Sequence, residues 1–133
     1  NVRIGFMEAG VSWLQTCLER FDRGWETHIQ YDPRGEYLQL KAGEKVSDYI
    51  RRHIEAGRIF VGCEGTEKGL HHLIEAVGNK PFMFSSDYPH EVNNEYCKHE
   101  IEEIIENEHL TDDDKHAVLH RNAERFYGLK PLG

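Results

Sequence analysis

The chain has 133 residues, which is about the size of one domain. Asp and Glu outnumber Lys and Arg by 24 to 16, and the resulting net charge of −8 disfavours contact with a phosphate backbone, so we expect no nucleic-acid partner. Hydrophobic residues make up 38% of the chain but form no run near the roughly 20 residues of a membrane span, which predicts a folded core and no membrane partner.

Three widely separated cysteines, Cys17, Cys63 and Cys97, form no CxxC pair. An odd number without tight spacing indicates a reduced protein, and the opening residues lack the charged region and long apolar core of a signal peptide. We therefore expect a cytoplasmic protein. The chain begins without Met and enters a strand-like stretch at once, which suggests a start inside a larger protein.

The first half of the chain predicts one strand and two helices. Residues 2–7 form a short apolar stretch, which predicts a buried strand. Apolar residues recur at three- to four-residue spacing over residues 12–25, which predicts a helix with one apolar side. The periodicity is lost over residues 26–45, where turn-forming residues at positions 32–35 predict a long connection. A short helix is predicted over residues 47–56.

The second half continues this alternation. Strands are predicted over residues 58–63 and 81–86, and Thr66 is expected to cap the helix between them. A final helical region is predicted from Thr111 to Gly128. A helix before it is predicted from the spacing of four apolar residues: Cys97, Ile101, Ile104 and Ile105. We interpret the many acids of residues 95–114 as a solvated helix face and an acidic helix start.

Alternating apolar strands and helices are typical of βα units on a parallel sheet, so the predicted class is α/β, with residues 1–133 as a single domain. The parallel strands predicted at 2–7, 58–63 and 81–86 would leave two unpaired edges. Further chain or a second copy of this one must therefore complete the sheet.

An acidic residue follows each predicted strand: Glu8, Glu64 and Asp87. Because the carboxyl ends of parallel strands meet at one edge of a sheet, we expect these side chains to share a site. Asp87 follows a fully apolar strand, where a carboxylate can ligate a divalent metal or take a proton from a metal-bound water. His90 offers an imidazole beside it.

Four segments, GFMEAGVSW, RIFVGCE, MFSSDYPH and NAERFYGL, occur in this order along the chain. Together they resemble the C-terminal part of the amidohydrolase-related family, whose members are metal-dependent TIM-barrel hydrolases and decarboxylases, aminocarboxymuconate semialdehyde decarboxylase among them. The resemblance covers nearly all of the chain. It implies a partial (β/α)₈ barrel, the last three βα units followed by C-terminal helices.

The resemblance also implies roles for individual residues. Asp87 matches the aspartate after the eighth strand, which binds the catalytic metal or acts as the base toward its water. Glu8 falls after the sixth strand, where the decarboxylases have a catalytic histidine, and a carboxylate can serve as a base there. We assign Glu64 and His90 to the substrate pocket.

The family's other metal ligands, a His-x-His pair after the first strand and a histidine after the fifth, have no counterpart in these residues. The resemblance implies a divalent metal in the complete enzyme, with zinc as the first choice. A zinc site generally needs three or four protein ligands, so this chain alone is expected to bind metal weakly or not at all.

Three hypotheses follow. The first is the C-terminal portion of a metal-dependent hydrolase or decarboxylase of a small carboxylate, amide or ester, inactive by itself and associated with the missing barrel half. The second is a non-catalytic α/β module that self-associates into a homo-oligomer. The third is a small zinc-binding adaptor that uses Cys97, His99 and His90.

Overall fold

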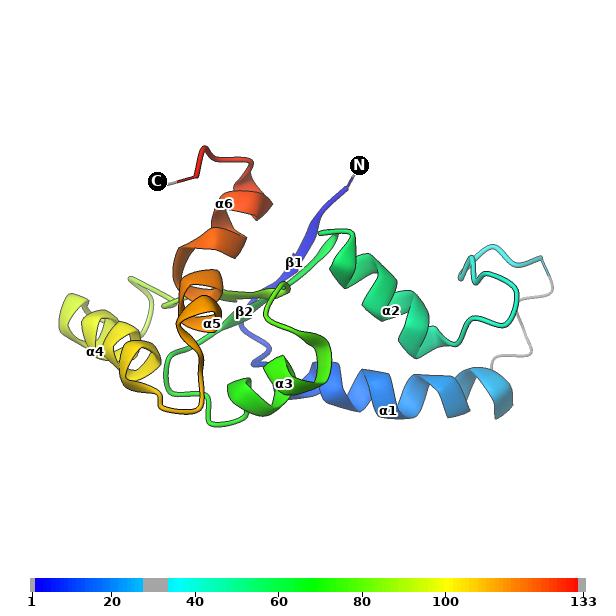
Figure 1. Ribbon diagram of the computed structural model, residues 1–133, viewed down its shortest axis with the longest axis horizontal. Helices are drawn as coiled ribbons and strands as arrows, with labels where there is room; N and C mark the ends of the chain where they lie inside the picture. The colour runs from blue at the N-terminus through cyan, green and yellow to red at the C-terminus, as the bar shows by residue number, and fades with distance from the viewer. Residues whose placement is uncertain (1, 28–33, 132–133) are drawn as a thin grey trace.

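A three-stranded sheet lies at the centre of the computed structural model, which describes residues 2–27 and 34–131 (Figure 1). The strands are β1 (Ile4–Phe6), β2 (Ile59–Cys63) and β3 (Phe82–Phe84). They are parallel, in the order β1-β2-β3. The predicted α/β class and the parallel strands are confirmed, and each strand is shorter than the apolar run that predicted it.

Helices follow each strand, as expected for βα units. They are α1 (Ser12–Thr27), α2 (Val46–Glu55), α3 (Leu70–Val77), α4 (Asn94–Glu106), α5 (Asp112–His116), the π-helical stretch η1 (Ala117–Arg121) and α6 (Asn122–Tyr127). Residues 34–45 between α1 and α2 contain no helix or strand, in line with the predicted long connection. The predicted turn at positions 32–35 falls partly on residues outside the described part of the chain.

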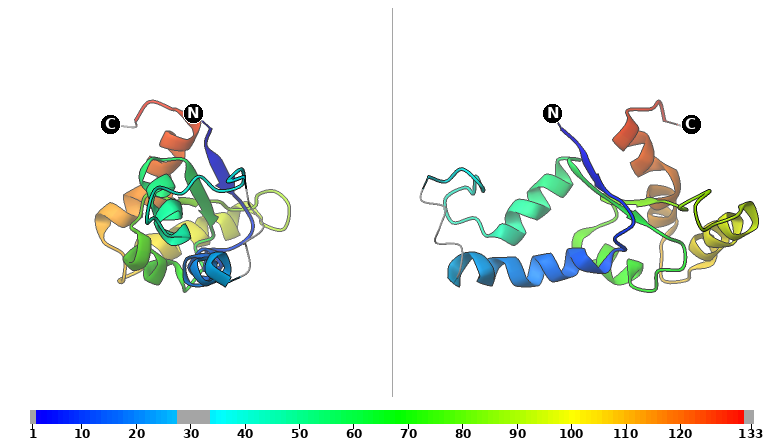
Figure 2. Two further views of the ribbon diagram at one scale, coloured as in Figure 1. Left: turned by 90° about the vertical axis from the view of Figure 1, so that its right-hand side faces the viewer. Right: turned by 180° about the vertical axis from the view of Figure 1, so that it is seen from behind.

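One face of the sheet packs against helices and forms the main core. Val61 and Phe82 are partners in the parallel ladder, and both are fully buried. α1 and α3 lie on the same side of the sheet (Figure 2). These helices and Val11, which directly precedes α1, bring a set of buried apolar residues to the cluster around these strands: Val11, Leu14, Leu18, Leu70, Leu73 and Val77. The apolar stripes read from the sequence therefore serve to cover the sheet.

The opposite face of the sheet is covered by the last helix. The Phe126 ring of α6 meets the Phe60 ring edge-on, with centroids 5.2 Å apart. A Cβ atom at Gly5, the ladder partner of Phe60, would lie 3.2 Å from Phe126 Cζ. Glycine therefore leaves room for the aromatic ring. In a closed barrel this face points to the interior, so Phe126 fills the interior side of these strands.

Asn122 fastens the carboxyl-terminal helices to β3. Its side chain is buried, and its Nδ2 donates hydrogen bonds to the backbone oxygens of Asn79 and Phe82, each at 2.7 Å. Such bonds satisfy carbonyl groups that would otherwise be buried without a partner. The contact between α6 and the sheet is therefore polar as well as apolar.

The predicted helix start at Thr66 is wrong, because α3 begins at Leu70 and Gly69 is its N-cap. The intervening residues form turns in which Glu67 N–H donates to Glu64 O and Leu70 N–H donates to Glu67 O. The predicted helix start at Thr111 is confirmed, with Thr111 as the N-cap of α5. Its Oγ1 accepts a hydrogen bond from Asp114 N–H, and Asp114 accepts one from Thr111 N–H in return.

The helix predicted from Cys97, Ile101, Ile104 and Ile105 is confirmed as α4, although the Ile105 side chain is 51% exposed. The buried positions of α4 are Ile104 and Glu100, the latter only 1% exposed. A Cβ atom at Gly65 would lie 1.9 Å from the Glu100 carbonyl oxygen, so the turn after β2 touches the backbone of α4. This close approach orients the helix with Glu100 inward.

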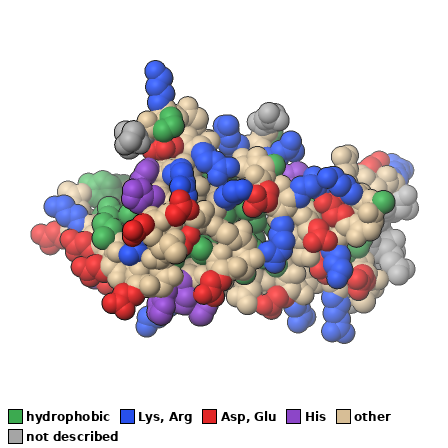
Figure 3. All heavy atoms as spheres, viewed as in Figure 1, with side chains coloured by type: hydrophobic (Ala, Val, Ile, Leu, Met, Phe, Trp, Pro, Cys, Tyr) green, Lys and Arg blue, Asp and Glu red, His purple; other side chains and the backbone are tan. Residues whose placement is uncertain are grey.

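Most acids of residues 95–114 lie on the surface, where Figure 3 shows acidic side chains gathered over α4. The interpretation as a solvated face is therefore confirmed for this helix, with Glu100 as the exception. Within the described ranges, no helix combines the length and the apolar character needed to cross a membrane.

Candidate active site

A small cavity lies where the three strands end. Glu8 follows β1, Glu64 follows β2 and Asp87 follows β3, and all three residues line the cavity. Its volume is about 10 Å³, close to what a single water molecule requires. The fold thus brings these carboxylates together, and the catalytic and binding roles assigned to them stay predictions.

Two of these acids have an unusual backbone conformation. Glu8 has a φ of 60° and Asp87 a φ of 55°, in the left-handed region that residues other than glycine rarely adopt. Residues held in this way cost on the order of 1–3 kcal/mol and concentrate at functional sites. The strain turns the chain sharply where it leaves the sheet. Consequently both side chains face the shared edge.

The loop after β3 places His90 beside Asp87. His90 N–H donates to the Asp87 backbone oxygen at 2.9 Å, and the Tyr88–Pro89 peptide bond between them is cis. His90 Nδ1 lies 3.9 Å from Asp87 Oδ2, but the imidazole is 81% exposed while the Asp87 side chain is 31% exposed. Unlike the three acids, His90 does not line the cavity.

Glu67 also lines the cavity, and the sequence did not single it out. Its Oε1 accepts a hydrogen bond from Glu64 N–H at 3.0 Å, and its Oε2 accepts one from Val11 N–H at 2.7 Å. One carboxylate thus ties the loop after β1 to the loop after β2. Hydrogen bonds to an ionised acceptor are among the stronger ones in proteins. Glu67 therefore holds the loops that carry Glu8 and Glu64.

Two glycines shape the cavity. A Cβ atom at Gly10, whose φ is 64°, would lie 3.2 Å from Glu67 Oε2. A Cβ atom at Gly62 would lie 2.8 Å from Met7 Cε, closer than real Cβ contacts. The Met7 side chain therefore lies against the β2 backbone at the edge of the cavity.

Cys63 lies on the floor of the same cavity but is unsuited to nucleophilic chemistry. Burial raises the pKa of its thiol, and the carboxylates of Glu67 and Glu64 raise the pKa further. The thiol therefore stays protonated at neutral pH, whereas the thiolate is the reactive form. The carboxylates remain the candidates for acid and base chemistry.

A family model described as Amidohydrolase matches residues 1–129. The chain belongs to the amidohydrolase family. No curated protein matches the chain, and no solved structure matches it either. Family membership, together with the three-stranded parallel sheet, confirms the coarser part of the resemblance read from the sequence.

The amidohydrolase family generally uses a divalent metal, which requires a set of suitably placed ligands. Among residues 2–27 and 34–131, no group of three His, Cys, Asp or Glu side chains is placed to bind a metal ion. Asp87 has one imidazole nearby, whereas zinc needs three or four protein ligands. The described residues therefore do not fit a complete metal centre.

The zinc-adaptor hypothesis fails on the same geometry. His99 Nε2 lies 3.6 Å from Glu103 Oε1 on its own helix. Among the residues that the structure describes, Cys97, His99 and His90 do not form a group placed to bind a metal ion.

Glu100 is a buried acid next to this site in the amidohydrolase chain. Its Oε2 has no hydrogen-bond partner among the described residues. Burial raises the pKa of its carboxyl, Glu64 raises the pKa further, and His99 lowers it. In an unfolded chain the pKa of a glutamate is about 4.3. Because folding raises the pKa of Glu100, the folded state keeps the proton up to a higher pH than the unfolded state does. The contribution of Glu100 to stability is thus fully present below the unfolded pKa and is lost as the pH rises through the folded pKa.

We expect Glu100→Gln to remove this pH dependence. The variant and the parent should differ little in free energy of unfolding near pH 4, and the variant should become the more stable of the two as the pH rises to 8. Urea titrations at both pH values measure the difference. Glu102→Gln, an exposed position on the same helix, is the control and should leave the parent's pH profile unchanged. Parallel profiles for Glu100→Gln and the parent would contradict the assignment.

Proposed function

We propose that this chain is the C-terminal part of a metal-dependent amidohydrolase that hydrolyses or decarboxylates a small carboxylate, amide or ester. The observation that carries the proposal is the meeting of Glu8, Glu64 and Asp87 around one cavity at the carboxyl ends of parallel strands. Active sites of barrels built from βα units lie at this end. Membership of the amidohydrolase family supports the same chemistry.

Asp87 is the proposed general base. Its carboxylate faces the cavity and is only partly exposed, which suits a group that takes a proton from an attacking water held there. Glu8 is the proposed second acid or base, from the opposite wall of the cavity. Glu64 and His90 are proposed to contact the substrate, His90 from the solvent side of the Asp87 loop. The metal ligands that the described residues lack would come from additional polypeptide, with zinc as the proposed metal.

The edge of the sheet at β1 supports the proposal that more strands belong here. Ile4 and Phe6 are 50% and 43% exposed, although they lie on the same face of the sheet as the buried Val61. Beside them, the buried Trp13 Nε1 has no acceptor among the described residues. A neighbouring strand would pair the free edge and cover these apolar groups, as barrel closure does.

The test compares this chain with a longer one that includes the coding sequence upstream of Asn1. Both are loaded with Zn²⁺, their metal content is measured, and both are assayed on a panel of small carboxylates, amides and esters. We expect the longer chain to bind metal stoichiometrically and to turn over a member of the panel, and the 133-residue chain to do neither. Absence of a His-x-His segment and of bound metal in the longer chain would overturn the proposal.

The exposed β1 edge also favours a second candidate, a non-catalytic module that closes its sheet by self-association. A symmetric dimer can pair like edges. The solution mass distinguishes the two functions, because a metal-free oligomer without turnover favours the module.

All three cysteines are free, which supports our further proposal of a reduced, cytoplasmic setting.

A further inference from the structure

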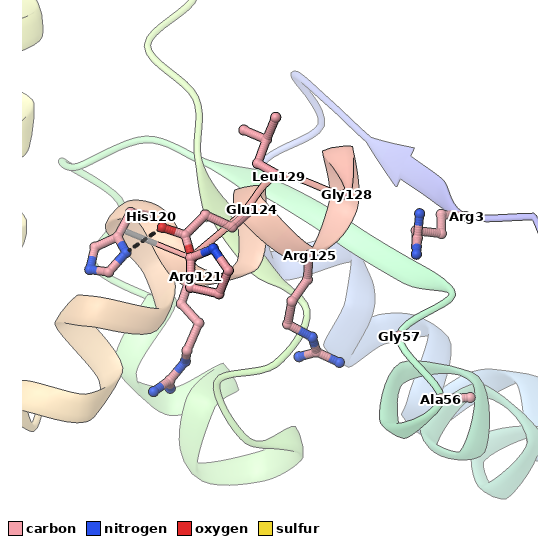
Figure 4. A pocket seen from close by; sticks show the side chains of 10 residues that line it. Arg3, Ala56, Gly57, His120, Arg121, Glu124, Arg125, Gly128 and Leu129 are labelled. Carbon is pink, nitrogen blue, oxygen red and sulfur yellow. Dashed lines mark hydrogen bonds and ion pairs between the residues drawn. The ribbon is translucent and has the colours of Figure 1, made fainter. Parts of the chain in front are cut away.

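A second, larger hollow lies at the other end of the sheet from the candidate active site. It has a volume of about 540 Å³, within the range of small-molecule pockets. Arg3 lines it just before β1, Gly57 just before β2, and residues of η1 and α6 complete the wall (Figure 4). Because both strands begin here, the hollow is separated by the length of the sheet from Glu8 and Asp87.

The lining is basic in an acidic protein. Three arginines and a histidine face one carboxylate, Glu124, in a chain whose net charge is −8. Glu124 Oε1 lies 3.2 Å from His120 Nδ1, so the one carboxylate of the lining already pairs with the histidine. Arg121 is also matched, since its guanidinium binds both carboxylate oxygens of Asp113, at 2.6 and 3.0 Å. Within the described part of the chain, neither Arg3 nor Arg125 has an acceptor.

The turn at Gly57 lies close to the Arg125 side chain. A Cβ atom at Gly57 would lie 2.9 Å from Arg125 Nη2, so the end of the guanidinium lies against the backbone of this turn. Gly57 also has a φ of 64°, which glycine adopts without strain. Figure 4 shows the Arg125 side chain extending from α6 toward the turn between α2 and β2. The guanidinium is therefore placed against a wall of the hollow.

We propose that this hollow binds a small organic oxyanion through Arg3 and Arg125. A guanidinium presents a planar fork of N–H donors that matches the oxygens of a phosphate or a carboxylate. Leu129 and Pro131 add an apolar side to the hollow, which suits the organic part of the ligand. A phosphate monoester and a dicarboxylate share this chemistry, and the experiment separates them. The site goes beyond the proposed function and uses none of the cavity acids.

The test is calorimetric titration of the chain at low salt with phenyl phosphate, succinate and inorganic phosphate. We expect saturable binding of phenyl phosphate or succinate, and the tighter of the two identifies the ligand class. Arg3→Gln and Arg125→Gln should each weaken that binding about tenfold, as expected for loss of a charge-assisted hydrogen bond. Arg125→Lys, which keeps the charge without the fork, should weaken binding less than Arg125→Gln.

Arg34→Gln is the matched control, because this exposed arginine pairs with Glu36 and does not line the hollow. It should bind as the parent does, and amide chemical shifts should move near Gly57 and Gly128 rather than near Asp87. Absence of saturable binding to the parent, or equal loss in Arg34→Gln, would overturn the proposal. Neither result bears on the active site at the other end of the sheet, so the two proposals can fail separately.

Discussion

Replacing Asp87 by asparagine is expected to lower the turnover of the complete enzyme by about 10²–10⁴-fold, the usual contribution of a general base. The amide keeps the shape of the side chain but cannot take up a proton. Asparagine also tolerates the left-handed backbone that Asp87 adopts, so the loop should keep its conformation. The measurement is kcat under saturating substrate, with a urea titration to show that the free energy of unfolding is unchanged.

Asp112→Asn is the control for this change. Asp112 is exposed in the first turn of α5, and it does not line the cavity at the strand ends. The same chemical substitution there should leave kcat at the parent value. Unchanged turnover in Asp87→Asn would remove Asp87 from the mechanism, whatever the substrate.

The Gly65→Ala variant is expected to lose about 3 kcal/mol of unfolding free energy, at the upper end of the usual cost of overpacking. The added Cβ would lie 1.9 Å from the Glu100 carbonyl oxygen and 2.5 Å from its carbon. These atoms belong to the backbone of α4 and cannot move aside as a side chain can. Either α4 or the turn after β2 must shift, and the burial of Glu100 is lost with it.

Urea unfolding of Gly65→Ala and Gly24→Ala gives the comparison. Gly24 lies within α1, where an added Cβ meets no atom within 4 Å. Alanine favours helix over glycine, so Gly24→Ala should gain about 0.5–1 kcal/mol. Equal midpoints for Gly65→Ala and the parent would show that α4 does not depend on this contact.

The α/β class and the parallel strands were predictable because apolar strands alternate with helices along the chain, as in a parallel sheet covered on both faces. The strand ends were not. β1 pairs with β2 only from Ile4 to Phe6, because ladder pairing depends on the partner strand and not on the local sequence. The helix start at Thr111 was read correctly, because the hydrogen bonds between Thr111 and Asp114 that form it are local.

The orientation of α4 shows what a local pattern cannot supply. Ile104 and Ile105 are equally apolar, and their spacing predicted a helix without deciding which of the two is buried. The turn at Gly65 approaches the helix from far along the chain and selects Ile104 and Glu100 as the buried positions. A charged residue between apolar neighbours is normally assigned to the surface, so a buried Glu100 was outside the reach of periodicity.

The candidate site was predictable in its three strand-end acids, because the topology of a parallel sheet brings strand ends together. Glu67 was missed because the segment around it was read as a helix beginning at Thr66. The three-residue separation between Glu64 and Glu67 was the signal in the sequence that could have identified it. An acid three residues after Glu64 can accept the Glu64 N–H, as acids do at the third position of a capping box, and the observed hydrogen bond has that form.

The buried amide of Asn122 has a consequence for synthesis of the chain on the ribosome. Nascent chains that stop before this position have the whole of β3 but lack the group that binds the carbonyl oxygens of Asn79 and Phe82. These carbonyl oxygens therefore gain this partner only when the last helix emerges. Truncations that remove α6 should consequently leave β3 open to proteases, even though every strand is still encoded.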